Sequence, residues 1–190
     1  MPMDSTSLDR SHAEVRRRLE MVAADQWDRP TPCEGWTVRD LVQHMAVGAT
    51  MARRILAGER WEREAVVEEV ASARDLKDEW EWRTAEERIG FGAPGVLGRM
   101  VAHPVMGEIP CTRFLGMRTG DALLHAWDLA RAVDADDQLP ADLVSEVWAH
   151  MSPMAGFIGS SGFFGSGPSG EVSEDAPLQT RLLDLSGRRA

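Results

Sequence analysis

Three side chains that can ligate a metal lie close together in the segment 120–132: Asp121, His125 and Asp128. An α-helix turns by about 100° per residue, so this spacing places all three within about 60° of one another. A carboxylate and an imidazole four residues apart on a helix can point at one ion, as in helical metal sites. The remaining residues are mostly alanine, leucine and tryptophan, so no wide solvated face accounts for the three polar groups.

A third ligand is available at His44, on a second helix expected from about Val38 to Leu56. His44 lies beside the apolar stripe of that helix, so in a helical bundle it faces the interior. Together with Asp121 and His125 it gives two imidazoles and one carboxylate. Three protein ligands that leave coordination positions open are typical of a catalytic metal site. The alternatives are a buried histidine without a metal and an ordinary polar helix face.

Two further residues are candidates for contacts with a cofactor or substrate. Asp128 lies one turn beyond His125 and could hydrogen-bond a ligand histidine or a substrate amine, or pair with Arg131 on the helix surface. Arg53, together with Arg54, could meet a substrate carboxylate, although solvated arginines are the alternative.

The remaining histidines and the first cysteine have weaker cases. Cys33 precedes the second helix, where a thiolate is favoured, but no base lies near it in the sequence, so packing is the simpler interpretation. His103 precedes a proline in a loop and is a candidate fourth ligand. His12 and His150 lie on charged helices and are expected to be solvated or structural.

Composition limits the possible partners. The 190 residues carry a net charge of −10, which argues against nucleic acid and anionic membranes. No apolar run approaches the roughly 18 residues of a transmembrane helix, and no secretory signal is visible at the first residues. The two cysteines form no CxxC motif, so we expect a reduced, cytoplasmic setting.

The hydrophobic periodicity predicts an all-α protein. Thr37 resembles an N-cap for the second helix, with Asp40 completing an acidic capping box. The segment 27–36 holds two prolines and a glycine and is expected to be a packed loop. The helices are expected at about 8–25, 38–56, 70–88 (longer if it starts near 62), 114–133, 140–151 and 175–187.

Three other segments are expected to be irregular. A turn-rich break covers 90–98, and a loop or a short extended pair covers 100–113. The segment 156–170 is rich in glycine and phenylalanine but lacks a phosphate-loop pattern. We expect it to be a flexible loop and a candidate cover for the site.

Three motifs give a resemblance to a known family. The stretches PCEGWTVRDLVQH (32–44), DALLHAWDLARA (121–132) and LLDLSGR (182–188) resemble the DinB-like superfamily. Within it they are similar to the actinobacterial branch related to the N-terminal domain of mycothiol-dependent maleylpyruvate isomerase. The resemblance implies one domain over 1–190, a DinB-like four-helix bundle with a short additional C-terminal helix and irregular loops. It also implies a divalent metal, usually zinc, on His44, Asp121 and His125.

The resemblance implies thiol chemistry, with a small-molecule substrate and mycothiol or another small thiol as partners and a homodimer as a possible assembly. Asp128 and Arg53 are then candidates for contacts with thiol or substrate. Two departures matter: Asp121 stands where the isomerase has glutamate, and 190 residues leave no room for its C-terminal domain. We therefore expect a thiol-dependent transferase or isomerase, with a non-catalytic metal-binding or ligand-binding module and a metal-dependent hydrolase as alternatives.

Overall fold

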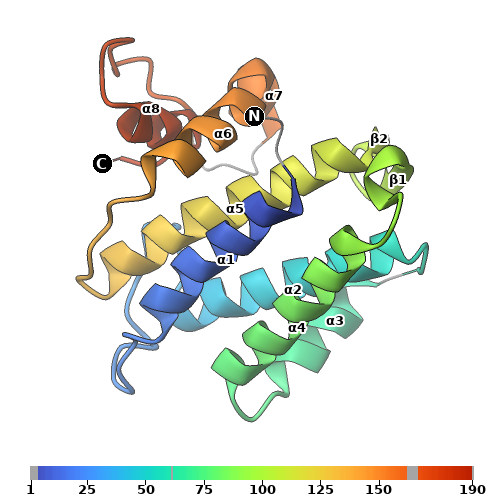
Figure 1. Ribbon diagram of the computed structural model, residues 1–190. Helices are drawn as coiled ribbons and strands as arrows, with labels where there is room; N and C mark the ends of the chain where they lie inside the picture. The colour runs from blue at the N-terminus through green and yellow to red at the C-terminus, as the bar shows by residue number, and fades with distance from the viewer. Residues whose placement is uncertain (1–3, 61, 162–166, 190) are drawn as a thin grey trace.

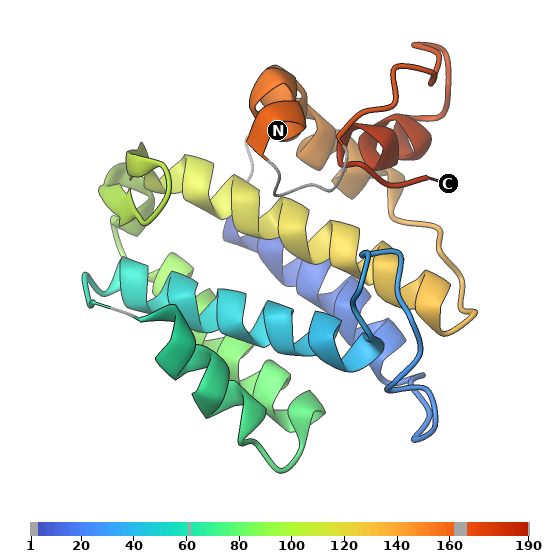
Figure 2. The same ribbon diagram turned by 180° about the vertical axis from the view of Figure 1, so that it is seen from behind.

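Four long helices form a bundle in the computed structural model, which describes residues 4–60, 62–161 and 167–189. Figures 1 and 2 show α1 alongside α5 and α2 alongside α4, and these are the two most extensive helix contacts. The predicted all-α, DinB-like bundle is confirmed. The four helices are α1 (Ser5–Leu19), α2 (Val38–Leu56), α4 (Leu76–Gly92) and α5 (Cys111–Ala132).

Shorter elements cover the bundle. The helix α3 (Arg63–Ala71) packs beside α2, and α6 (Ala141–Met151) lies across α5. Beyond α6 follow a 3₁₀ turn (Ser152–Met154), α7 (Ala155–Ser161) and α8 (Leu178–Leu185), which packs on α6. Among the described residues, no helix is long and apolar enough to cross a membrane.

The second helix has the predicted bounds, and its capping box fixes where it begins. The Thr37 hydroxyl accepts a hydrogen bond from the Asp40 backbone N–H at 3.2 Å, and the Asp40 carboxylate accepts one from the Thr37 N–H at 2.9 Å. Two N–H groups that lack helical partners are satisfied in this way. The start of α2, and with it the position of His44, is therefore fixed locally.

The helix predicted over most of 70–88 is present as α4, but the longer single helix starting near 62 is wrong. The structure has two helices, α3 and α4, separated at 72–75. The Asp75 carboxylate accepts hydrogen bonds from the N–H groups of Lys77 and Asp78, so it caps a new helix instead of continuing the old one. The first helix also ends earlier than Asp25, because the N–H groups of Met21 and Val22 bond three residues back and tighten the last turn.

The region before α5 is an extended pair, one of the two alternatives expected there. The strands β1 (Met100–His103) and β2 (Gly107–Pro110) are antiparallel, with Val101 opposite Ile109 and both side chains buried. A 3₁₀ turn (Val96–Gly98) falls within the predicted break. The helix α5 then begins directly at Cys111, three residues before the predicted start.

The predicted loop over 156–170 is wrong in its first part, where α7 extends to Ser161. The 3₁₀ turn that ends α6 leads directly into this helix, and the buried Ile158 holds it against the core. The middle of the predicted loop, 162–166, lies outside the described residues.

The core centres on α5, which is buried on almost every side. Its Leu123 and Trp127 have 0% and 1% exposure, and they join a cluster with residues of α1, α2, α4, α6 and α8. A helix of this kind provides little solvated surface for polar side chains. Its buried charged residues, Arg118 and Asp128, must therefore find partners inside the protein.

Candidate metal centre

The structure brings His44, Asp121 and His125 together, from α2 and α5. The Nε2 atom of His125 lies 3.3 Å from Oδ1 of Asp121, and Nε2 of His44 lies 3.6 Å from the same oxygen. One ligand atom from each residue falls within 4.8 Å of the other two. The side chains of His44 and Asp121 are 30% and 28% exposed while that of His125 is 8% exposed, so the triad is open to solvent on one side.

His125 is oriented by Asp128, one turn further along α5. The Nδ1 atom of His125 lies 2.8 Å from Oδ2 of Asp128, whose side chain is fully buried. Arg188 donates to both oxygens of Asp128, from Nε at 2.9 Å and from Nη2 at 2.6 Å. Because Nδ1–H donates to this carboxylate, the Nε2 lone pair of a neutral His125 points toward Asp121. This is the carboxylate–histidine arrangement that orients metal ligands.

The Oδ2 atom of Asp121, which does not face the imidazoles, is bound by an arginine. Arg118, one turn earlier on α5, donates from Nη1 to Oδ2 of Asp121 at 2.7 Å. The same guanidinium donates from Nε to Oε1 of Glu87, on α4, also at 2.7 Å. Glu87 is fully buried, and its second oxygen lies 3.4 Å from Nε2 of His12 on α1. His12 is thus buried within the bundle, which agrees with the structural one of the two alternatives expected for it and not with the solvated one.

These charges shift the pKa values in the triad. Burial opposes ionisation of Asp121, but the charges of His125 and Arg118 hold the pKa of its carboxyl well below the usual range. Burial also opposes protonation of His125, but Asp121 and then Asp128 raise its pKa well above the ordinary value. Burial lowers the pKa of His44. Without a metal, His125 therefore retains a proton that a bound cation would displace.

The loop between α1 and α2 runs beside the start of α2 and beside α5 (Figure 2), and two of its side chains contact the site. The ring centroid of Trp36 lies 4.8 Å from that of His44 and 6.3 Å from that of His125. The Cys33 thiol donates to Oδ2 of Asp128 at 3.3 Å. The loop is fixed by backbone hydrogen bonds, including Thr31 N–H to the Trp36 carbonyl at 2.9 Å. Both of its side chains at the site are therefore held firmly in place.

Two donor sets in the described residues could hold a cation, and both use His125: His44 with Asp121, and Cys33 with Asp128. The first fits a divalent transition metal better. Its Nε2 and Oδ1 atoms converge beside an open side, and imidazole and carboxylate are suitable ligands for such ions. In the second set, the Arg188 guanidinium occupies both oxygens of Asp128 and would repel a cation there.

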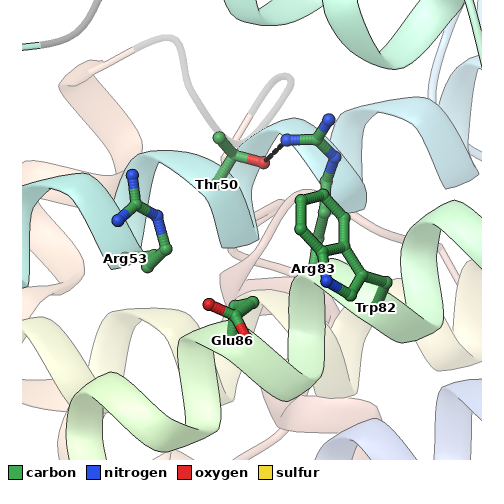
Figure 3. Close-up of a pocket in the computed structure, with 5 residues that line it drawn as sticks. All are labelled: Thr50, Arg53, Trp82, Arg83 and Glu86. Atoms are coloured by element: carbon green, nitrogen blue, oxygen red, sulfur yellow. Dashed lines mark hydrogen bonds between the residues drawn. The ribbon is translucent and has the colours of Figure 1, made fainter.

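The other sequence candidates lie elsewhere. Arg53 follows His44 by nine residues on α2, nearly on the opposite side of the helix. It pairs with Glu59 at 2.6 Å and lines a small pocket with Thr50, Trp82, Arg83 and Glu86 (Figure 3). The structure therefore does not bring Arg53 to the triad.

The remaining charged candidates also have partners away from the triad. Arg54 pairs with Glu69, Arg131 pairs with Asp137, and the Nδ1 atom of His103 accepts N–H groups of its own turn.

The sequence reasoning missed Trp36, Arg118 and Arg188, which contact residues of this site, and Glu87, which binds Arg118. Arg118 had a visible signal, since it lies three residues before Asp121 on the same predicted helix. Arg188 lies within a motif of the family resemblance, but no spacing rule joins it to Asp128. Glu87 lies in a charged run that a sequence cannot distinguish from a solvated face.

Comparisons with known proteins agree with this architecture. Residues 8–130 match the model of the family described as "Mycothiol maleylpyruvate isomerase N-terminal domain". Two uncharacterized proteins, from two strains of Mycobacterium tuberculosis, are each 34% identical over 138 residues, which is 73% of this chain and 71% of theirs.

Solved structures give the same fold. The crystal structure of mycothiol-dependent maleylpyruvate isomerase superposes with a TM-score of 0.63 at 19% identity, over 83% of this chain and 68% of that one. A histidine-to-alanine mutant of that enzyme gives 0.64 at 17% identity with the same coverage. On the strength of the matched residues and of these relatives, the chain belongs to the family of the mycothiol maleylpyruvate isomerase N-terminal domain.

Proposed function

We propose that this protein binds a divalent metal, with zinc as the first candidate, through His44, Asp121 and His125, and uses it to act on a small molecule with a thiol such as mycothiol. The observation that supports this most strongly is the convergence of two imidazoles and a carboxylate within 4.8 Å on one open side of the bundle. The family membership supports the choice of thiol. A thiol-dependent transferase or isomerase is the reaction class that we favour.

The charges around the triad favour an anionic ligand. Three carboxylates (Glu87, Asp121 and Asp128) face two guanidinium groups (Arg118 and Arg188), which leaves one negative charge when the histidines are neutral. A divalent ion reverses this to one positive charge. Buried charge is costly unless it is compensated, so a monoanionic ligand such as a thiolate balances the site.

A divalent metal, when bound, supplies Lewis acidity that lowers the pKa of a thiol ligand and so favours the nucleophilic thiolate. The residues of this chain provide the frame. Asp128 fixes the ring orientation of His125, and Arg118 fixes one oxygen of Asp121. Trp36 packs against both imidazoles and shields them from water on that side.

The test combines elemental analysis of the purified protein with calorimetric titration by zinc and then by mycothiol. We expect about one ion per chain, and mycothiol binding only in the metal-loaded protein. The His44→Ala and Asp121→Ala variants should lose both zinc binding and mycothiol binding. Arg53→Ala is a matched control, because it removes a charged residue of the same helix as His44 that pairs with Glu59. It should bind metal and thiol like the wild type.

Each other result has a defined meaning. A wild-type protein that binds no divalent ion, after loading with zinc, would refute the proposal. Metal binding without thiol binding would refute the thiol function and favour a metal-braced binding module. Thiol binding that survives Asp121→Ala would separate the thiol from the metal, contrary to the proposal.

A further inference from the structure

Arg118 joins the candidate metal ligand Asp121 to a buried carboxylate on another helix. Its Nη1 atom donates to Oδ2 of Asp121 and its Nε atom donates to Oε1 of Glu87, both at 2.7 Å. The side chain of Arg118 is 7% exposed and that of Glu87 is fully buried. We infer that Arg118 is a positioning residue of the metal centre and that Glu87 holds it in place. This inference rests on the proposed function.

The two carboxylate oxygens of Asp121 contact different partners. Oδ2 is occupied by Arg118, whereas Oδ1 faces both His125 and His44, at 3.3 and 3.6 Å. An aspartate has only two side-chain torsions, so a bond that fixes one oxygen also fixes the direction of the other. Arg118 therefore presents Oδ1 to the two imidazoles before any ion arrives. Preorganisation of this kind is what residues behind a ligand contribute to metal affinity.

Packing alone does not account for the Glu87–Arg118 pair. A buried ion pair is a weak source of stability, because the loss of hydration offsets most of the attraction. This pair lies at the centre of the bundle, and its guanidinium continues to a residue of the triad. An arginine suits this role because its planar fork can bond two carboxylates at once, whereas a lysine is a point charge.

The opposing helix has a glycine where the guanidinium lies. A Cβ atom at Gly48 would be 2.7 Å from Nη1 of Arg118 and 3.1 Å from its Cζ. Gly48 follows His44 by one turn on α2, so a larger residue there would push the guanidinium away from Asp121. Gly48 thus offers a way to disturb Arg118 without removing any charge.

The experiment measures zinc affinity and the visible spectrum of the cobalt-loaded protein for Arg118→Lys and Gly48→Ala. Each has a matched control. Arg83→Lys changes another buried arginine, which pairs with Glu69 and Glu79 away from the triad. Gly90→Ala adds a Cβ atom 2.9 Å from a leucine side chain on α2. We expect zinc affinity to fall about 10- to 100-fold in the two test variants, with an altered cobalt spectrum, and to stay within about threefold in the controls.

Folding is checked by circular dichroism and thermal unfolding of each variant. Gly48→Ala retains all charges, so it leaves no buried charge without its partner. A double variant, Glu87→Gln with Arg118→Gln, removes both charges of the buried pair together. That double variant should also bind zinc more weakly. If the wild type binds zinc and all three folded variants match its affinity and spectrum, the inference is wrong while the proposed function stands. If the wild type itself binds no divalent ion, both are wrong.

Discussion

Replacing Asp128 by asparagine tests whether the carboxylate beneath His125 is essential to both the fold and the site. The side chain is fully buried and accepts from Cys33, His125 and twice from Arg188. Burial opposes its ionisation, but Arg188 and then His125 lower its pKa from an ordinary 3.8 to about 2. That difference corresponds to about 2 kcal/mol of stabilisation at neutral pH.

The variant also leaves Arg188, whose side chain is only 11% exposed, without a counter-charge. Removal of one partner of a buried pair costs about 3–5 kcal/mol. We therefore expect Asp128→Asn to lower the free energy of unfolding by about 2–5 kcal/mol at pH 7, measured by urea denaturation with a chelator present. Asp142→Asn is the control, since that side chain is 71% exposed beside Arg10, and it should lower the free energy of unfolding far less than Asp128→Asn does.

The contribution of Asp128 to the free energy of unfolding should depend on pH in a defined direction. A depressed pKa means that Asp128 stabilises the fold above about pH 4, where it is ionised in both states, and that this is lost as the pH falls toward 2. The difference in the free energy of unfolding between the wild type and Asp128→Asn should therefore be largest at pH 7 and should decrease below about pH 4. A loss of less than about 1 kcal/mol at pH 7, or strict additivity with Arg188→Gln, would refute the reasoning.

The raised pKa of His125 predicts that zinc binding at pH 7 releases about one proton per ion, and that affinity increases with pH until that pKa is passed. Calorimetry in two buffers of different ionisation enthalpy measures the release; no difference between the buffers would contradict it. Cobalt binding should quench the fluorescence of Trp36, which packs on His44, and Trp36→Phe should remove that part of the signal. Thr37→Ala should cost about 1 kcal/mol, because it removes the cap of α2, and an unchanged urea midpoint would show that the capping box is not needed.

The sequence was most informative where the determinants are local. The capping box at Thr37 lies at the helix end that it sets, and α2 was predicted with its observed bounds. The polar residues of α5 share one side because of helical period alone. The Asp75 cap is equally local, but it lies in a charged run without a clear apolar stripe, so the break between α3 and α4 was missed.

The site was predictable only in part, because its partners come from distant segments. Spacing on one helix brings Asp121 and His125 together, whereas the place of His44 beside them depends on how α2 packs against α5. Arg188 reaches Asp128 from 60 residues away, and Glu87 reaches Arg118 from 31. No periodic pattern encodes such pairs, since each depends on the tertiary arrangement of a single side chain.

Asp121 and Asp128 lie on the same side of one helix, yet the structure gives them different chemistry. Both oxygens of Asp128 are occupied, by four donors in all. Asp121 has one oxygen bound to Arg118 and the other directed at two imidazoles. A carboxylate whose two oxygens both accept hydrogen bonds has no lone pair directed at a metal ion, whereas one with a single occupied oxygen does. The difference between the two aspartates therefore arises from which arginine each one meets, and not from its position on the helix.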